Sequence, residues 1–593
     1  MQQRLANCKA WIQNLDHISR LPSSGRYATV RATHALTAMF STGPRAFLRT
    51  LSHIRPQIRY TYGRTRTSAI RPIHSQTYSS STGKLRITGG ALVLFGGVLA
   101  YQSLAHTTLR LDALTAIPEK KPRTIQHEPV TRFWERPGVF LWGSNSGRVA
   151  SPDSDETFVK APRRVPFFDG YVLRDLQLSH DMGVAVLENG DLVQWGKGYT
   201  PECRIPVVTF EGKDIVKAGL SEDRIVALSS SGKVYSIPFS KEEQELFAKP
   251  TESSGLPFWK STSESKTSYR DLTPAKEKIV DIAVGHEHTV MLTSRGKVFT
   301  AACASYNFPS KGQLGIPGMS WESKPKPYDT PQEVKDLDKF QITQIAAGNY
   351  HSVAADKEGK IFVWGDNTKG QLGLDFTEDS TPKPKLIPRR AFYKGDGIKT
   401  KLQQIFAGGY NTYFTMETHT PNEDFNKPAV QTYDVFACGH GLHGSLGTGF
   451  YAHAQAAPQK VKSISGLTEY SEKKAGLVPI NTSYLTVGGS HTAVVMSNQQ
   501  NIGASDAEFG NDILFFGGNE FYQLGNGKRA NQNVPAYISP IDSGSGKKSD
   551  DRFQVIPGKK IKFLDQNSKS RSVKIEQRVV AGRGLTGCYA KTA

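Results

Sequence analysis

Histidine has the widest chemical reach of the residue types in this sequence, because its side chain serves as base, acid or metal ligand near neutral pH. His286, His288, His351 and His491 are the candidates. His288, His351 and His491 close the same short pattern, Gly-x-x-His followed by Ser or Thr. Residues that recur at one place in successive repeats are separated in space, so we expect no shared metal centre. Buried polar groups need partners, and we expect each histidine to bond to backbone inside its own repeat.

Other reactive residue types do not form a catalytic pattern either. His440 and His443 are a pair without cysteine or carboxylate company, which is weak support for a zinc site. The five cysteines are far apart and contain no Cys-x-x-Cys, so neither a disulfide scaffold nor a zinc site is indicated. The glycine-rich stretch 439–449 is not followed by Gly-Lys-Ser/Thr, and no Gly-x-Ser-x-Gly elbow stands out. The sequence therefore predicts no catalytic, cofactor-binding or metal-binding residue, and a protein that is not an enzyme.

The elements that must position these residues are short, alternating and rich in β-branched and aromatic side chains. Each Gly-x-x-His copy follows an apolar run and is paired with a second element that ends in Trp-Gly or a relic of it. Several pairs then reach a Gly-Gln-Leu-Gly turn, as at 312–315 and 370–373. We interpret the tryptophans as packing residues rather than a binding cage. The predicted structural positions of the repeats are Gly285, His288, Gly348, His351, Gly408, Gly488, His491, Trp142, Gly143, Trp195, Gly196, Trp364 and Gly365.

The spacing of the repeats predicts the fold. The glycines at 219, 285, 348 and 408 are 66, 63 and 60 residues apart, which suits one four-stranded blade per repeat. Seven copies of each element can be counted, so we expect an all-β, seven-bladed β-propeller over residues 138–593. The array starts with a Trp-Gly element at Val139 and ends with a Gly element at Val580. These two halves should combine into one blade and close the ring.

Variable segments interrupt the repeats at 238–277, 374–400, 417–432, 450–480 and 540–575. Loops on a rigid scaffold carry recognition, whereas a solvated insertion is the alternative, because long loops add little entropic cost. The last segment contains Lys547, Lys548, Lys559, Lys560 and Lys562, a candidate contact for an anion or RNA that Asp550, Asp551 and Asp565 dilute.

The N-terminal part has the composition of a targeting sequence rather than of a folded domain. Residues 1–111 contain fifteen Lys and Arg against one acidic residue, Asp16, and so carry +14 of the net charge of +20. An arginine- and serine-rich, acid-poor stretch is typical of a mitochondrial transit peptide, which we assign to residues 1–80. Residues 112–593 carry only +6, from 59 basic and 53 acidic groups, so a nucleic-acid partner is not indicated.

An apolar segment at 87–105 lies within twenty-three residues that contain no Lys, Arg, Asp or Glu. At about 1.5 Å per residue, nineteen residues cover most of a hydrocarbon core of about 30 Å, so we expect one transmembrane helix. Basic residues flank it on both sides and leave its orientation open. Residues 106–137 are expected to be a linker. The predicted location is the mitochondrial inner membrane, with a single pass.

The Gly-x-x-His-Ser/Thr, Trp-Gly and Gly-Gln-Leu-Gly elements resemble regulator of chromosome condensation repeats. That family forms seven-bladed propellers, and the resemblance covers about residues 138–593. With its transit tail and apolar segment, the whole chain is similar to fungal mitochondrial membrane proteins that carry these repeats. The resemblance implies a role in assembly of a respiratory-chain complex of the cytochrome bc1 type.

The resemblance leaves rival functions open. Our leading hypothesis is a non-catalytic, membrane-tethered scaffold that binds mitochondrial proteins, such as respiratory assembly intermediates. One alternative is a guanine-nucleotide exchange factor for a mitochondrial small GTPase, since the founding member of the family acts on a small GTPase. Another is a factor associated with the mitoribosome or RNA. No sequence feature identifies an exchange loop.

Overall fold

The computed structural model describes residues 136–254, 261–305, 308–319, 328–394, 397–422, 429–472, 474–498, 510–541 and 552–593. The expected presequence (1–80), the expected transmembrane helix (87–105) and nearly all of the expected linker (106–137) lie outside these residues. Within the described part of the chain, no helix combines the length and apolarity needed to cross a bilayer.

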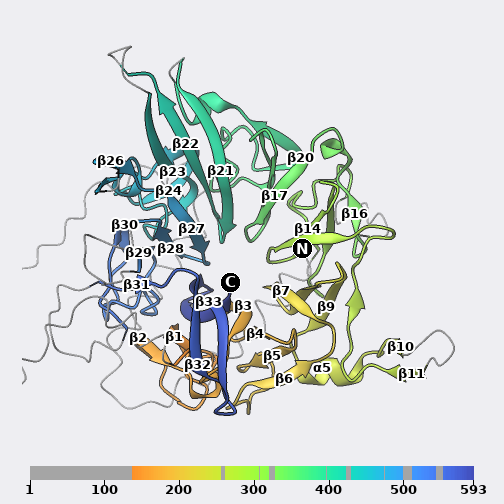
Figure 1. Ribbon diagram of the computed structural model, residues 1–593. Helices are drawn as coiled ribbons and strands as arrows, with labels where there is room; N and C mark the ends of the chain where they lie inside the picture. Colours follow the sequence, from red (N-terminus) through yellow and green to blue (C-terminus); the bar gives the residue numbers. More distant parts are fainter. Residues whose placement is uncertain are drawn as a thin grey trace, which may run out of the picture. The chain divides into compact units, whose positions relative to one another are not determined.

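The described residues form an all-β propeller, in which small antiparallel sheets stand around a central axis (Figure 1). Five sheets each come from one continuous stretch of sequence. They are β7 (Ile215–Leu220), β8 (Arg224–Ser229), β9 (Val234–Pro238) and β12 (Arg270–Asp271); β13 (Ile279–Val284), β14 (His288–Thr293), β15 (Val298–Ala302) and β16 (Gln332–Glu333); β17 (Ile342–Ala347), β18 (His351–Asp356), β19 (Ile361–Asp366) and β20 (Ser380–Ile387); β21 (Lys399–Gly408), β22 (Asn411–Thr420), β23 (Val430–Gly441) and β24 (Ala452–Lys460); and β27 (Thr482–Val487), β28 (His491–Met496), β29 (Asn511–Gly517), β30 (Gln532–Ala536) and β31 (Gln554–Val555).

A nine-stranded sheet joins the two ends of the described chain. Its members are β1 (Val139–Ser144), β2 (Phe158–Arg164), β3 (Leu173–Leu178), β4 (Gly183–Leu187), β5 (Leu192–Trp195), β6 (Val207–Phe210), β32 (Lys559–Leu564), β33 (Ser570–Ala581) and β34 (Leu585–Thr592). β1 pairs antiparallel with β34 from Val139–Tyr589 to Gly143–Leu585. This pairing confirms the prediction that the first and last repeat elements combine. A single parallel pairing, Leu173 with Lys591, connects β34 to β3.

Further small elements lie in the connections between strands. They are the helix α5 (Lys241–Leu246), the hairpins β10 (Thr251–Ser254)–β11 (Ser261–Glu264) and β25 (Thr468–Ser471)–β26 (Gly476–Pro479), and the 3-10 turns η3 (Pro166–Phe168), η4 (Lys335–Leu337), η5 (Arg389–Ala391) and η6 (Lys462–Ile464). The variable segments at 450–480 and 540–575 therefore contain paired strands rather than loops alone.

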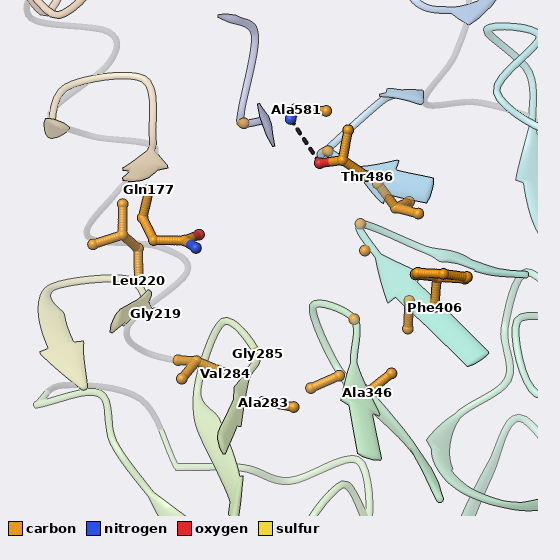
Figure 2. Close-up of a pocket in the computed structure, with 18 of the residues that line it drawn as sticks. Gln177, Gly219, Leu220, Ala283, Val284, Gly285, Ala346, Phe406, Thr486 and Ala581 are labelled. Carbon is orange, nitrogen blue, oxygen red and sulfur yellow. Dashed lines mark hydrogen bonds between the residues drawn. The ribbon is translucent and has the colours of Figure 1, made fainter. Parts of the chain in front are cut away.

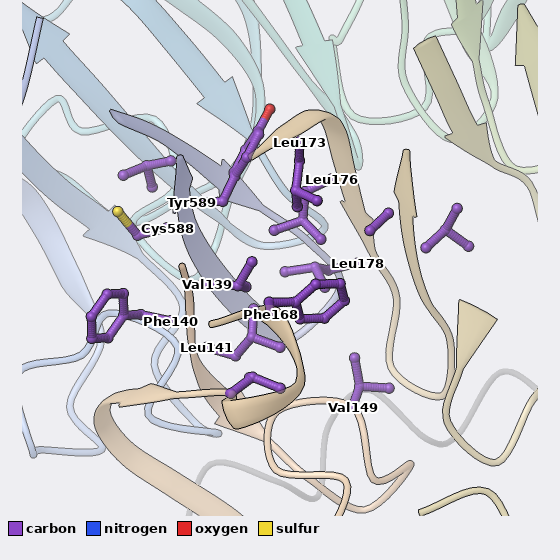
Figure 3. Packing of buried hydrophobic residues seen from close by; sticks show 14 of the residues in the cluster. Val139, Phe140, Leu141, Val149, Phe168, Leu173, Leu176, Leu178, Cys588 and Tyr589 are labelled. Atoms are coloured by element: carbon purple, nitrogen blue, oxygen red, sulfur yellow. The ribbon is translucent and has the colours of Figure 1, made fainter. Parts of the chain in front are cut away.

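The largest core cluster is built across the junction of the chain ends. Every residue of β1 is buried, which explains its continuous apolar sequence, because a strand covered on both faces does not alternate. Figure 3 shows Val139 and Leu141 of β1 packed with Leu173 and Leu176 of β3 and with Tyr589 of β34. Closure of the ring therefore buries apolar surface from both ends of the sequence.

Antiparallel strands give the propeller two faces with different connections. The turns between the first and second strands of each sheet, such as 285–288, lie at the same end as the loops that follow the Trp-Gly elements. We call this end the Gly-His face. The opposite end, the hairpin face, carries the far ends of β22–β23 and the hairpins β25–β26 and β32–β33.

Candidate functional site: the central channel and the Gly-His face

The repeat glycines allow neighbouring innermost strands to approach closely around the axis. A Cβ atom placed on Gly285 would lie 2.6 Å from the carbonyl oxygen of Gly348. One placed on Gly348 would lie 2.8 Å from the carbonyl oxygen of Gly409. Gly408 and Gly488 meet the backbone of the next sheet in the same way, at Val487 and Gly582. These glycines are needed for contact between sheets, which is more than a local turn preference.

Backbone hydrogen bonds connect successive sheets at the mouth of the channel. The Glu222 N–H donates to the His286 carbonyl oxygen (2.9 Å), and the His286 N–H donates to that of Asn349 (2.9 Å). The Asn349 N–H donates to the Gly409 carbonyl oxygen at 2.7 Å. The turns of the Gly-His face are thus fixed relative to one another, as a rigid recognition surface requires.

The repeat histidines connect neighbouring sheets, and our expectation that they bond to backbone of their own repeat was wrong. Nε2 of His288 lies 2.8 Å from Oγ of Ser352, and Nε2 of His351 lies 2.9 Å from Oγ1 of Thr412. Nε2 of His491 lies 2.7 Å from Oγ1 of Thr586. Ser352, which accepts from His288, directly follows His351, which in turn contacts Thr412 of the next sheet. The adjacent His and Ser of one motif therefore contact the sheets on either side.

The donor in these contacts follows from a second hydrogen bond that each hydroxyl group makes. The hydroxyls of Ser352, Thr412 and Thr586 donate to the carbonyl oxygens of Gln313 (3.1 Å), Gln371 (2.6 Å) and Gln523 (2.6 Å). Each histidine therefore donates through Nε2–H and is neutral, with Nδ1 facing its own repeat glycine. Complete burial lowers the pKa of His288, His351 and His491 to about 3, which keeps them uncharged at neutral pH.

The Trp-Gly elements contribute to the same contacts between adjacent sheets, which we call seams. Trp364 donates from Nε1 to the Gln313 carbonyl oxygen, and Trp142 donates to that of Gln523, both at 2.9 Å. Trp195 donates to the Val149 carbonyl oxygen at 3.0 Å. The following glycines Gly143, Gly196 and Gly365 have φ of +115°, +104° and +103°. A positive φ there lets the third strand bulge away and turn into its loop.

Divergent repeats keep the seam with other side chains. Cys438, in place of a tryptophan, donates its thiol to the Gln371 carbonyl oxygen at 3.6 Å. Where Asn411 replaces histidine, Nδ2 donates to the Ser445 hydroxyl at 3.1 Å, and the Tyr413 hydroxyl donates to the Ser445 carbonyl oxygen. The Tyr413 hydroxyl also lies 3.0 Å from Oγ1 of Thr492 in the next sheet. The tyrosine therefore takes the place of the histidine as the link between sheets.

The axis of the propeller holds a cavity of about 460 Å³. Seven segments line it, at 177–179, 217–220, 282–285, 345–349, 405–409, 485–489 and 581–583. Figure 2 shows Gln177, Val284, Phe406 and Thr486 around this space, and the Ala581 N–H donating to Oγ1 of Thr486 at 2.8 Å. The lining is glycine-rich, and more of its accessible surface is polar than apolar. Its charged side chains are Lys217, which pairs with Asp281 at 2.6 Å, and Arg583.

Charged groups gather at the mouth of this cavity on the Gly-His face. Burial, with the neighbouring Glu222 carboxylate, raises the pKa of Glu287 to about 7. Burial lowers the pKa of His286, and the Arg583 guanidinium lowers it further. Burial also raises the pKa of Tyr350 to about 12. The Glu287 carboxyl group, which accepts a hydrogen bond from Gln313, is therefore the group at the mouth whose pKa lies closest to neutral pH.

A row of rings, half-buried except for the exposed His453, crosses the Gly-His face from the mouth to the rim. The ring centroids of His286 and Tyr350 are 5.6 Å apart, and those of Tyr350 and Tyr410 are 5.8 Å apart. Tyr410 lies 6.3 Å from His440, which in turn lies 5.8 Å from each of His443 and His453. Burial and the neighbouring His443 lower the pKa of His440 to about 4. We call these six residues the aromatic row.

A second aromatic group lies on the same face beside the closing sheet. Phe158 is 6.3 Å from Phe521 and 5.7 Å from Tyr522, and the Arg529 guanidinium lies 5.4 Å from the Phe158 ring. Tyr522 has φ of +63°, at the turn position where three other turns have Gly312, Gly370 and Gly444. A non-glycine residue in this region costs about 1–2 kcal/mol, and such strain clusters at functional positions.

Several of these surface residues were not predicted from the sequence as members of a site. Tyr350, Tyr410 and Arg583 occupy the two variable positions that follow the repeat glycine, and His453 lies in β24, ten residues after His443. The signal that identifies the first three is their place between fixed residues. In the Gly-x-x-His turn, the two residues that differ among the repeats of this chain point outward, whereas the glycine and the histidine face the neighbouring sheet.

Three of the four cysteines among the described residues have thiols that burial holds in the protonated form. Burial raises the pKa of Cys303 to about 12 and raises those of Cys438 and Cys588 still further, so these thiols stay protonated. No group of three or more His, Cys, Asp or Glu side chains in the described ranges is arranged to hold a metal ion.

Comparison with protein families finds regulator of chromosome condensation (RCC1) repeats in this chain. The repeat model matches residues 310–355 and 358–414, and a second model of the same repeat matches 342–371. Among curated relatives, the mitochondrial protein FMP25 of Saccharomyces cerevisiae is 27% identical over 441 residues, which cover 68% of this chain and 67% of FMP25. This match agrees with the resemblance to fungal mitochondrial proteins drawn from the motifs.

Two further comparisons come from other organisms. The mitochondrial RCC1 domain-containing protein RUG3 of Arabidopsis thaliana is 27% identical over 257 residues, which cover 40% of this chain and 51% of RUG3. The crystal structure of human WBSCR16 superposes with a TM-score of 0.51 at 17% identity, and covers 77% of this chain and 99% of that chain. The structural match supports the propeller fold alone.

Proposed function

From the premise that this chain carries regulator of chromosome condensation repeats, we propose that it is a non-catalytic mitochondrial scaffold. It binds protein partners on the Gly-His face and is tethered to the inner membrane by residues 87–105. The partners that fit this proposal are assembly intermediates of a respiratory-chain complex of the cytochrome bc1 type. Residues 1–80 serve as the import signal, and 106–137 as the linker to the propeller.

We further propose that residues 138–593 form seven blades. The nine-stranded sheet then counts as two blades, β33-β34-β1-β2 and β3-β4-β5-β6, whose strands pair with each other only at Leu173 and Lys591. The seven segments around the central cavity support this count, since each blade contributes one.

The observation that carries the binding proposal is the aromatic row, together with exposed apolar side chains in the loop between β23 and β24. Phe450 is 75% exposed and Tyr451 is 55% exposed in the loop between β23 and β24, next to Leu442 in the same loop. The cores of protein interfaces are enriched in aromatic side chains and Arg and depleted of other charges. A rigid turn surface that presents Tyr, His and Phe side chains over several sheets therefore suits a protein partner.

The mitochondrial location is supported by the names of FMP25 and RUG3, both of which are described as mitochondrial. Carbonate extraction of isolated mitochondria tests the tether. We expect the chain in the membrane pellet, and its release into the supernatant would contradict the proposed span.

The binding proposal is tested by crosslinking and affinity purification from mitochondria with a matched pair of variants. The first variant, Leu442→Asp with Phe450→Asp, places charge on the Gly-His face. The control, Tyr470→Asp with Leu477→Asp, places the same change on the exposed hairpin β25–β26 of the other face. We expect respiratory assembly intermediates with the wild type and the control, and about a tenfold loss of them with the first variant.

Two outcomes would redirect the proposal. Recovery of ribosomal components alone would replace the respiratory role with the mitoribosome-associated one. Accelerated nucleotide release from a mitochondrial small GTPase would support exchange activity, which requires only tighter binding of the nucleotide-free GTPase. A flat response across such GTPases would dismiss that alternative.

A further inference from the structure

The β32–β33 hairpin has one side packed on the propeller and one side turned away from it. Ile561, Phe563 and Ile575 are buried members of the largest core cluster. The alternate residues Lys560 and Lys562 are exposed, as is Leu564, which has 59% of its surface accessible. The inner side of the hairpin is therefore apolar and buried, and its outer side is polar except for Leu564 near the turn.

The register of the two strands gathers positive charge on that outer side. Lys560 pairs with Lys574 and Lys562 pairs with Ser572, so these side chains project from one side of the hairpin. Leu564 and Ser570 occupy the last positions of the same side before the turn. Three lysines therefore share this surface, and the Glu576 carboxylate, two residues after Lys574 on the same side of β33, pairs with Arg578 at 2.6 Å.

Of the three acidic residues expected to dilute this charge, Asp550 and Asp551 lie outside the described residues, and Asp565 has a role in the turn. Oδ1 of Asp565 accepts hydrogen bonds from the N–H groups of Asn567 and Lys569, each at 2.9 Å, and so shapes the turn at the tip. Arg571 projects from the packed side and pairs with Glu188 at 2.8 Å. The outer side consequently keeps its lysines as a net positive surface.

The tip of the hairpin lies beside the point where the chain enters the propeller. The Gly170 N–H donates to the Pro137 carbonyl oxygen at 2.9 Å. A Cβ atom on Gly170 would lie 2.8 Å from the Gln566 nitrogen, so the same turn contacts the hairpin tip. Arg136 pairs with Asp169 at 2.9 Å and holds this entry in place.

The length of chain before this entry limits the distance of the hairpin from a bilayer. This step rests on the proposed function, in which residues 87–105 span the membrane. The linker 106–137 then has 32 residues, which reach at most about 110 Å even when fully extended. Tethering at this range raises the effective concentration of the adjoining face at the bilayer surface.

We propose that the outer side of the β32–β33 hairpin docks on an anionic lipid surface. Lys560, Lys562 and Lys574 lie over lipid phosphates, and Leu564 enters the interfacial region. Clusters of lysine beside a membrane anchor are attracted to anionic headgroups, and an added apolar side chain gives the second signal that stable interfacial binding needs. Single-stranded RNA fits less well, because it is held by aromatic stacking and this side of the two strands carries no aromatic residue.

The test uses the full chain with Cys8→Ser in proteoliposomes, since the four cysteines of the described residues are buried. An environment-sensitive fluorophore is attached at Ser572→Cys, opposite Lys562 on the outer side. The control label is attached at Ala530→Cys, an exposed position on the Gly-His face. A quencher carried by the lipids reports contact with the bilayer.

We expect the quencher to remove about half of the fluorescence at position 572 in bilayers that contain anionic lipid. The quenching falls in neutral bilayers and in high salt, which screens the charges, and position 530 is unaffected. Lys560→Glu with Lys562→Glu abolishes the quenching, whereas Lys197→Glu with Lys528→Glu on the opposite face preserves it.

The outcomes separate failure of the docking from failure of the tether. Absence of quenching at position 572, in a chain that stays in the carbonate pellet, would overturn the docking and leave the span intact. Equal quenching at positions 572 and 530 would also overturn it. Release of the chain by carbonate would overturn both proposals. A fluorescence response to short single-stranded RNA, with none to anionic vesicles, would assign the surface to nucleic acid.

Discussion

The Gly-His face and the hairpin face terminate the same strands but are constructed differently. On the Gly-His face, His351, Thr412 and Gln371 form one of several equivalent contacts between sheets, and short turns fix the backbone. On the hairpin face, β22 and β23 continue well past the seams, β25–β26 is added between two sheets, and β32 extends the closing sheet by pairing with β33.

The difference shows where a repeat protein tolerates change. A turn that takes part in a seam is held by partners in two sheets, so both its length and its fixed residues are constrained. A connection on the other face needs only to join two strand ends, and the entropic cost of a longer loop grows slowly. Insertions therefore occur in connections outside the seams, with α5 and β10–β11 after the third strand β9 on the Gly-His face and β25–β26 on the hairpin face, while the variable side chains of short turns give the Gly-His face its individual surface.

The largest expected effect tests the closed ring on which both faces depend. Removing residues 570–593 deletes β33 and β34, and with them the antiparallel partner of β1 and much of the largest core cluster. We expect the truncated chain to lose cooperative unfolding and to become protease-sensitive throughout. Limited proteolysis and thermal unfolding measure this, and a truncated chain as protease-resistant as the full one would contradict the closure argument.

The next prediction compares buried polar contacts on the two faces. His351→Ala leaves the Thr412 hydroxyl without its donor and opens a cavity, so we expect a loss of about 3 kcal/mol in the free energy of unfolding. Thr418→Val breaks the hydroxyl contact of Thr418 with Thr432 (2.6 Å), between the extended ends of β22 and β23.

For this second variant we expect a loss of about 1 kcal/mol or less, because only one neutral hydrogen bond within a single sheet is removed. Denaturant unfolding of the two variants side by side provides the measurement. Equal losses would show that the seams are no more important to stability than contacts within the extended strands.

A pH experiment isolates the mouth of the channel. Since the pKa of Glu287 is raised to about 7, its folded form holds a proton that the unfolded form releases near pH 4.5. The resulting stability is present below pH 4.5 and is lost as the pH rises through about 7. We expect Glu287→Gln to be more stable than the wild type at pH 8, with the difference disappearing at pH 4.5.

The difference between the wild type and the variant separates this effect from that of the buried histidines. Their lowered pKa values act in the opposite sense, so their stability is present above pH 6.5 and is lost as the pH falls toward 3. Melting temperatures of both proteins between pH 4.5 and 8 test the prediction. A difference that does not change with pH would mean that Glu287 titrates normally.

The smallest effect is expected on the hairpin face. Replacing residues 468–479, the hairpin β25–β26, with a short Gly-Ser linker removes two strands that pair with each other. We expect a change of about 1 kcal/mol or less in the free energy of unfolding and no loss of partners captured by the Gly-His face. A large fall in stability would show that this hairpin supports the neighbouring sheet.

Much of the fold follows from local sequence, and the reasons are visible in particular residues. Gly285 and Gly348 were predicted as structural positions of the repeat, and the Trp-Gly pairs as the end of its second element. The spacing of the repeats led to the propeller, and Val139 and Val580 as unpaired elements led to the closing sheet. These features are readable because each is a local requirement that recurs.

The partners of the repeat residues were not readable in the same way. The sequence placed His351 in a structural role but assigned it a bond inside its own repeat, since nothing local indicates a partner 61 residues away. The variable segment at 540–575 was read as a loop with diluted charge, whereas pairing of β32 with β33 places Lys560, Lys562 and Lys574 on one side.

The sequence by itself determined the repeat, its period, its glycine and tryptophan positions and the separation of a basic N-terminal part from a nearly neutral array. These depend on short-range patterns in which every residue is constrained by its immediate neighbours. The tertiary structure alone decided that the histidines clamp adjacent sheets and that Tyr350, Tyr410 and His440 align in one row. It also brought the hairpin tip beside Pro137. Such contacts join residues tens to hundreds of positions apart, and only closure of the ring brings them within reach.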